Sequence, residues 1–191
     1  MKNKCIFLDR DGTINVYKNL LHKKEDFILL DNAAEAIQMI NESDYLSIVV
    51  TNQPVVARNL CSFDYMWGIN RKMEELLAKQ GAYLDDILVC PHHPDQGYPE
   101  ENKEYKKKCN CRKPGIGLIE KAVMKHHIDL TKSYIIGDTT VDIKTGINAG
   151  LRTVLVKTGL KGEDGKFNVM PDFVSDDLKA AVEFVLTKAS K

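Results

Sequence analysis

The sequence lacks a long apolar run, an excess of either charge and an even number of cysteines, and each absence excludes a class of protein. No window of the 191 residues could span a bilayer, and the N-terminal apolar run is too short for a signal peptide. Basic and acidic residues both number 27, so no overall charge favours nucleic acid or anionic lipid. Five cysteines without a secretory context argue against a disulfide framework.

Internal repeats and low-complexity linkers are also absent, and the composition is that of a soluble globular protein. Hydrophobic residues make up 43% of the chain and charged residues 28%. A length of 191 residues suits one domain with a sizeable core, so we expect a single domain over residues 1–191. We expect a cytoplasmic monomer whose partner is neither a nucleic acid nor a membrane.

Short apolar runs rich in β-branched residues alternate with amphipathic helical patterns. The runs are nearly continuous, as in strands covered on both faces of a parallel sheet, and lie at residues 5–8, 45–50, 87–90, 134–136 and 153–156. Helical patterns lie at residues 32–41, 62–79, 117–126, 142–148 and 177–186, with Ser62 as an N-cap. The alternation predicts an α/β fold, a Rossmann-like doubly wound parallel sheet, with residues 91–108 and 158–171 as loops.

Polar side chains follow three of the expected strands. They are Asp9 and Asp11, then Thr51, Asn52 and Gln53, and finally Asp138. Because ligands bind at the carboxyl ends of strands in open α/β sheets, we expect these groups to converge. Carboxylates so close together repel unless a cation lies among them, and hard oxygen ligands suit Mg²⁺. One such aspartate alone could equally be a helix cap or turn former, but the whole set favours a metal site.

The D-x-D-G spacing from Asp9 to Gly12 superficially resembles a calcium-binding EF-hand loop. That loop requires glycine at its sixth position and glutamate at its twelfth. Counted from Asp9, those positions hold Ile14 and Leu20. The calcium interpretation is therefore excluded.

A second constellation combines three cysteines with a histidine pair, in the order Cys90, His92, His93, Cys109 and Cys111. Two close pairs of such ligands fit a tetrahedral Cys₃His zinc site, although the spacing within each pair is shorter than usual. The alternative is a set of scattered thiols. Against it, a structural zinc would order a loop, residues 90–111, that is otherwise too polar to hold itself together.

The motif F-L-D-R-D-G-T resembles motif I of the haloacid dehalogenase (HAD) superfamily of phosphatases. Further along the chain, Thr51 resembles its motif II, Lys113 its motif III, and Asp138 with Asp142 its motif IV. The resemblance implies a HAD-like fold and a Mg²⁺-dependent phosphatase. No large cap domain is inserted, so short segments at residues 15–26 and 91–111 are expected to wall the site.

The same resemblance implies a role for each motif residue. Asp9 would be the nucleophile that forms an aspartyl-phosphate, and Asp11 the general acid and base with its side chain free for proton transfer. Lys113 would neutralise charge on the transferring phosphoryl group. The implied Mg²⁺ ligands are Asp9, Asp138 and the backbone carbonyl of Asp11. The implied substrate-binding residues are Thr51, Asn52, Gln53, Arg112 and Lys113.

The pattern C-P-H-H-P followed by C-x-C-R-K-P resembles the zinc-loop phosphatases of this superfamily. These act on D-glycero-D-manno-heptose 1,7-bisphosphate, and relatives act on histidinol phosphate. The resemblance implies a structural Zn²⁺ and a small phosphorylated metabolite as substrate. The implied zinc ligands are Cys90, His92, Cys109 and Cys111.

The sequence departs from the heptose-phosphatase pattern at two places. Pro54-Val55 stands where a Ser-Gly pair is usual, and Thr139 stands where a lysine is frequent. Heptose bisphosphate is the expected substrate, and histidinol phosphate is the alternative. A binding module that kept the fold and lost catalysis is an alternative of another class. The intact catalytic set argues against it, namely Asp9, Asp11, Lys113 and Asp138.

Overall fold

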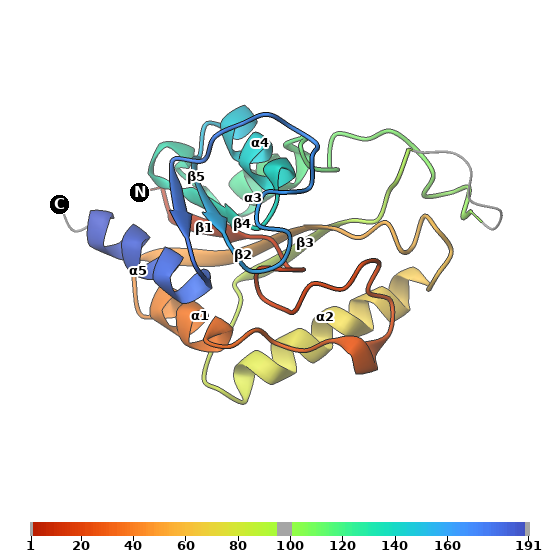
Figure 1. Ribbon diagram of the computed structural model, residues 1–191, viewed down its shortest axis with the longest axis horizontal. Helices are drawn as coiled ribbons and strands as arrows, with labels where there is room; N and C mark the ends of the chain where they lie inside the picture. The colour runs from red at the N-terminus through yellow and green to blue at the C-terminus, as the bar shows by residue number, and fades with distance from the viewer. Residues whose placement is uncertain (1, 95–100, 190–191) are drawn as a thin grey trace.

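The computed structural model describes residues 2–94 and 101–189 (Figure 1). Residues 95–100, which belong to the expected zinc loop, lie outside the described residues, as do residues 1 and 190–191.

A six-stranded parallel sheet forms the centre of the molecule, in the order β3-β2-β1-β4-β5-β6. The strands are β1 Lys4–Leu8, β2 Tyr45–Asn52, β3 Asp86–Cys90, β4 Tyr134–Gly137, β5 Arg152–Val156 and β6 Phe173–Ser175. The five expected strands are all present, which confirms the Rossmann-like doubly wound α/β prediction. Strand β6 was not predicted, because three residues are too few to carry a periodic pattern.

Helices cover both faces of the sheet (Figure 1). On one face lie α1 Ala33–Asn41, α2 Phe63–Ala78 and α5 Leu178–Ala189, and on the other lie α3 Gly117–His126 and α4 Thr140–Ala149. Two short 3₁₀ helices, Lys24–Asp26 and Leu130–Lys132, complete the described elements. None of the helices in the described part of the chain is long and apolar enough to cross a membrane.

The apolar runs are continuous because successive residues of each strand enter different cores. In β1, Ile6 and Leu8 pack with the core that also contains residues of α1, α2 and α5. Cys5 and Phe7 pack on the opposite side, where the core includes residues of α3. All four side chains are fully buried. A strand with two buried faces needs apolar residues at every position, as the sequence shows.

The strand order reverses at β1, which pairs with β2 on one side and β4 on the other. Ligands of open α/β sheets bind at such a switch point, beyond the carboxyl ends of the strands. Asp9 follows β1 and Asp138 follows β4 at this edge. Residues 9–32 carry only the 3₁₀ helix Lys24–Asp26, so a short segment stands where a cap domain would be inserted.

Candidate active site

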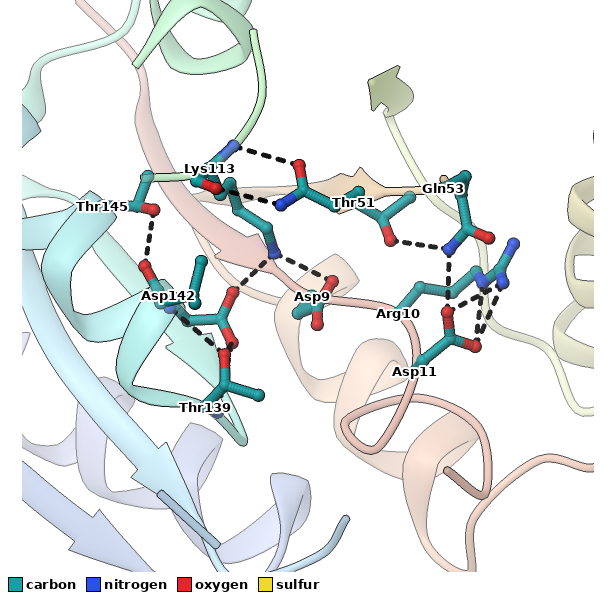
Figure 2. Close-up of polar contacts among 11 residues, drawn as sticks. Asp9, Arg10, Asp11, Thr51, Gln53, Lys113, Thr139, Asp142 and Thr145 are labelled. Carbon is teal, nitrogen blue, oxygen red and sulfur yellow. Dashed lines mark hydrogen bonds and ion pairs between the residues drawn. The ribbon is translucent and has the colours of Figure 1, made fainter. Parts of the chain in front are cut away.

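Asp9, which directly follows β1, forms an ion pair with Lys113. The Nζ atom of Lys113 lies 2.9 Å from Oδ1 of Asp9 and 2.5 Å from Oδ1 of Asp142, so the lysine bridges two carboxylates (Figure 2). Lys113 and Asp142 are buried, and Asp9 lies at the border of burial. These residues come from the end of β1, the loop before α3 and the first turn of α4. The fold thus joins three sequence motifs at one point.

Asp138 lies beside this group with one oxygen held and the other unpaired. Its Oδ2 accepts a hydrogen bond of 2.7 Å from the backbone N–H of Leu160. Its Oδ1 is buried and has no hydrogen-bond partner among the described residues. An unpaired buried carboxylate oxygen is costly, and such an atom is a place where a water molecule or an ion can bind. Asp9, Asp138 and Asp142 can each offer an oxygen within 4.8 Å of the others.

The electrostatics of this cluster favour a cation. Burial, followed by the negative charges of Asp9 and Asp142, raises the pKa of Asp138 to about 8. Burial also raises the pKa of Asp9 to about 6, although the ammonium of Lys113 opposes the shift. Burial alone would lower the pKa of Lys113, but Asp142 and Asp9 raise it above its ordinary value. Three carboxylates around one ammonium carry excess negative charge, so the cluster fits a hard divalent cation such as Mg²⁺.

Asp11 points away from Asp9, although the two are separated by one residue (Figure 2). Its carboxylate accepts hydrogen bonds from Nη2 of Arg10 at 2.9 and 3.0 Å, from Nδ2 of Asn15 at 3.0 Å and from Nε2 of Gln53 at 2.8 Å. The Asp11 side chain is therefore held by three neighbouring residues. Arg10 lies between the two aspartates in the sequence, but its hydrogen bonds to Asp11 were not predicted.

Asp142 and Thr139 form the start of α4. The Thr139 hydroxyl accepts from the backbone N–H of Asp142, and Asp142 accepts in turn from the backbone N–H of Thr139, which is a capping box. The other carboxylate oxygen of Asp142, Oδ1, accepts a hydrogen bond from Lys113, so Asp142 connects the lysine to α4. Thr139, which stands where related phosphatases often have lysine, thus has a defined role as the N-cap.

Thr51, Asn52 and Gln53, at the end of β2, line a cavity next to these carboxylates. Asn52 and Gln53 also form hydrogen bonds to other residues of the site. The side-chain amide of Asn52 donates to the Lys113 carbonyl at 3.1 Å and accepts from the Lys113 N–H at 3.0 Å. Gln53 donates to Thr51 Oγ1 at 3.0 Å as well as to Asp11. The cavity has a volume of about 200 Å³. Its other walls are residues 17–21, Arg112 and the start of α4.

The Cys/His cluster lies at the end of β3 and in the loop that follows. Sγ of Cys111 lies 3.1 Å from Sγ of Cys90 and 3.2 Å from Sγ of Cys109, and Nδ1 of His92 lies 3.2 Å from Cys111 Sγ. A tetrahedral zinc with Zn–S bonds of about 2.3 Å would place its sulfur atoms about 3.8 Å apart. None of the five cysteines, all of which are described, forms a disulfide. The four donor atoms converge, and three thiols with one imidazole are a donor set that suits zinc, although two of the sulfur–sulfur distances are shorter than in a zinc-bound site.

His93 lies outside this cluster. Its Nε2 is 3.3 Å from Nη2 of Arg58, and its side chain is buried. The structure brings together the four residues that the resemblance implied as ligands, with His92 as the histidine. Arg112 connects the cluster to the cavity, because its Nη1 donates to the His92 carbonyl at 3.1 Å while its side chain lines the cavity wall.

Sequence reasoning missed the segment after β5, which was interpreted only as a loop. Leu160 supplies the N–H that holds Asp138, and Thr158 Oγ1 donates to the Gly12 carbonyl at 2.6 Å. Gly159 has a φ of +62°, and a Cβ at this position would collide with Asp138. The glycine content of the segment was the available signal for this close approach.

Comparison with known proteins identifies the family of this chain. A family model of HAD-hydrolase-like proteins matches residues 110–181. The D-glycero-beta-D-manno-heptose-1,7-bisphosphate 7-phosphatase of Haemophilus influenzae is 38% identical over 177 residues, covering 92% of this chain and 93% of the relative. The corresponding alpha-anomer phosphatase of Photorhabdus laumondii is 40% identical over 159 residues, covering 83% and 85%.

A solved structure resembles the whole described fold. The D,D-heptose 1,7-bisphosphate phosphatase of B. bronchiseptica, crystallised with magnesium and phosphate, matches with a TM-score of 0.84 at 30% identity. The match covers 97% of this chain and 99% of the other.

Proposed function

Since this chain belongs to the heptose-1,7-bisphosphate 7-phosphatase family of HAD-like hydrolases and is a phosphatase, we propose that it removes the 7-phosphate of D-glycero-D-manno-heptose 1,7-bisphosphate. The observation that carries the proposal is the meeting of Asp9, Asp138 and Lys113 at the switch point of the sheet. A nucleophile, a cation site and a fixed positive charge are the three things that phosphoryl transfer needs.

The reaction proceeds in two steps. A carboxylate oxygen of Asp9 attacks phosphorus, the bond from phosphorus to the sugar oxygen breaks, and Asp11 gives the departing oxygen a proton. Water then attacks the aspartyl-phosphate, Asp11 takes its proton, and Asp9 and inorganic phosphate are released. Lys113, 2.9 Å from Asp9, neutralises charge on the phosphoryl oxygens in both steps.

Two metals accompany this chemistry in our proposal. Mg²⁺ would be held by Asp9, Asp138 and the backbone carbonyl of Asp11, and would supply positive charge to the phosphoryl oxygens. The unpaired Oδ1 of Asp138 supports this assignment. Zn²⁺, held by the four residues of the Cys/His cluster, is structural, because all four tetrahedral positions are then filled by protein.

Two consecutive cations support a substrate with two phosphates. Lys113 is 5% exposed and contacts the proposed nucleophile, whereas Arg112 is partly exposed on the cavity wall. The first is suited to the phosphate that is transferred and the second to a distal group of the sugar. Thr51, Asn52 and Gln53 complete the wall around the transferred phosphate.

Phosphate release with Mg²⁺ present tests the proposal. The substrates are both anomers of heptose 1,7-bisphosphate, heptose 7-phosphate as a single-phosphate control, and histidinol phosphate. We expect the highest kcat/KM for a bisphosphate anomer, with ³¹P NMR showing that the phosphate on C1 remains. A higher kcat/KM for histidinol phosphate would overturn the sugar assignment. Both anomers are needed, because relatives of similar identity carry names for each.

A monomeric state and a cytoplasmic location stay predictions from the sequence.

A further inference from the structure

Arg10 is a buried arginine whose side chain donates hydrogen bonds to Asp11 and to Asn70. Its side chain is 0% exposed, and it is among the largest fully buried side chains of the chain. Nη2 donates to both carboxylate oxygens of Asp11, at 3.0 Å to Oδ1 and 2.9 Å to Oδ2. Nη1 points elsewhere and donates to Oδ1 of Asn70 at 2.9 Å. The guanidinium therefore spans from the catalytic loop to α2.

Asn70 is itself held in one orientation. It lies on α2 with a side chain that is 0% exposed, and its Nδ2 contacts the sulfur of Met66, one turn earlier, at 3.6 Å. With the amide nitrogen on the sulfur, the amide oxygen faces Arg10 and accepts a hydrogen bond from its Nη1. A buried guanidinium that has one carboxylate and one fixed amide as partners has little freedom to move.

Asp11 is the only member of this chain of contacts that lines the cavity. Its side chain is 19% exposed there, whereas Arg10 and Asn70 lie behind it. Figure 2 shows Arg10 and Gln53 on Asp11, apart from the contact between Asp9 and Lys113. Without the guanidinium, only the amides of Asn15 and Gln53 would hold the Asp11 carboxylate, each through one hydrogen bond, and rotation about its two side-chain torsions could take it out of line with the leaving oxygen.

We propose that Arg10 and Asn70 are positioning residues that hold the Asp11 carboxylate in line with the departing oxygen of the substrate. The inference rests on the proposed role of Asp11 as acid and base. It extends the catalytic machinery to a side chain on α2 that does not touch the cavity. Misplacement of a catalytic group by about 1 Å can cost on the order of a hundredfold in rate, so the pair matters without contacting substrate.

The test uses two esters that differ in their need for an acid. An alkyl sugar phosphate needs a proton on its leaving oxygen, whereas p-nitrophenolate leaves without one. We expect Asn70→Ala to lower kcat/KM for the sugar phosphate by about tenfold to a hundredfold and for p-nitrophenyl phosphate by less than about threefold. KM should change little, because neither residue contacts the substrate.

A double-mutant cycle separates positioning from a structural role. In the Asp11→Asn background, Asn70→Ala should cost no further activity, because no acid remains to be positioned. Met73→Ala is the matched control, since Met73 is a fully buried residue of α2 that belongs to the apolar core. It should lower the melting temperature while changing the two esters alike.

Equal losses on both esters for Asn70→Ala, or losses that multiply with those of Asp11→Asn, would overturn the positioning role. If Asp11→Asn itself fails to distinguish the two esters, the acid role of Asp11 fails and this inference fails with it. Should Asn70→Ala not fold, Arg10→Lys carries the same test, because it keeps the buried charge and loses the paired geometry.

Discussion

The two candidate metal clusters of this protein are built in opposite ways. Asp9 and Asp138 directly follow neighbouring strands, and Asp142 belongs to the first turn of α4. In the Cys/His cluster only Cys90 belongs to a strand, and the other three residues lie in the loop before α3. The carboxylates are therefore placed by the sheet and its helices, whereas most of the thiol cluster depends on a loop with little regular structure.

The residues that contact the two clusters differ in the same way. Lys113, the N–H of Leu160 and the N-cap Thr139 hold the carboxylates in place. In the other cluster the sulfur atoms and His92 chiefly contact one another. The fold thus preforms the carboxylate site for a metal that exchanges, while a metal bound to the thiols would form the loop around itself.

The clusters are joined because Cys111, Arg112 and Lys113 are consecutive. A metal on the thiols fixes Cys111, the residue that directly precedes Arg112 and Lys113 of the cavity wall. Loss of a carboxylate should therefore remove chemistry and leave the structure intact, whereas loss of a thiol should loosen structure and weaken chemistry indirectly.

The largest effect is expected for Asp9→Asn. Removing the attacking group should lower kcat by about 10⁴-fold or more, because the proposed covalent intermediate forms on Asp9. Zinc content, measured by elemental analysis, should stay at one per chain. Asp86→Asn, at the start of β3 and paired with Lys125 and His126, is the control that should keep activity. Activity within tenfold of wild type in Asp9→Asn would rule out the covalent route.

A smaller loss of activity is expected for Cys109→Ser, together with loss of zinc. The released loop should let Lys113 drift from Asp9 and lower kcat/KM by about tenfold to a hundredfold, as for other supporting ligands. Cys61→Ser is the matched control, since Cys61 lies outside the cluster. Zinc retained in Cys109→Ser would refute the ligand assignment, and zinc lost with unchanged activity would break the proposed link between the clusters.

The contrast between the clusters also explains what the sequence could predict. Strand ends carry the carboxylates, and strands with two buried faces are visible as continuous apolar runs, so the positions of Asp9 and Asp138 predicted that they converge, while their roles came from the family resemblance. His92 and His93 are adjacent, and general ligand spacing does not separate them, so only the family resemblance selected His92.

Other contacts of the site could not be predicted from the local sequence. Leu160 acts through its backbone N–H, which any residue but proline could supply. Arg10 is fully buried against Asp11 and Asn70, and the second of these lies sixty positions away in the sequence. An arginine beside two aspartates is usually solvated, so its burial depends on where α2 packs. Tertiary packing, and no pattern in the sequence, decides such contacts.

Arg112 lies between the two clusters and should affect the choice of substrate. Loss of a charge-assisted contact with a phosphate costs about tenfold to a hundredfold, so Arg112→Ala should lower kcat/KM for heptose bisphosphate by that factor. The loss for p-nitrophenyl phosphate should be severalfold smaller, because that ester has no distal phosphate. Arg112→Lys is the control that retains the charge. Equal losses on both esters would show that Arg112 serves the chemistry.

The smallest effect concerns the pH dependence of Mg²⁺ binding. In the metal-free protein, burial and the neighbouring carboxylates raise the pKa of Asp138 to about 8. A carboxyl group with a raised pKa keeps its proton below that pH, and Mg²⁺ must displace it. The affinity for Mg²⁺ should therefore fall about tenfold as the pH falls from 9 to 7, and Asp9, with a pKa of about 6, should weaken it further in more acidic solution.

Calorimetric titration of Mg²⁺ in two buffers of different protonation enthalpy measures both the affinity and the protons released. Near pH 7 about one proton should leave per Mg²⁺ bound, and above pH 9 close to none, because Asp138 is then ionised before binding. Asp86→Asn should leave this profile unchanged, since that carboxylate lies at the amino end of β3. An affinity that stays constant from pH 7 to pH 9 would show that Asp138 carries no proton in the metal-free protein at pH 7, and would contradict its raised pKa.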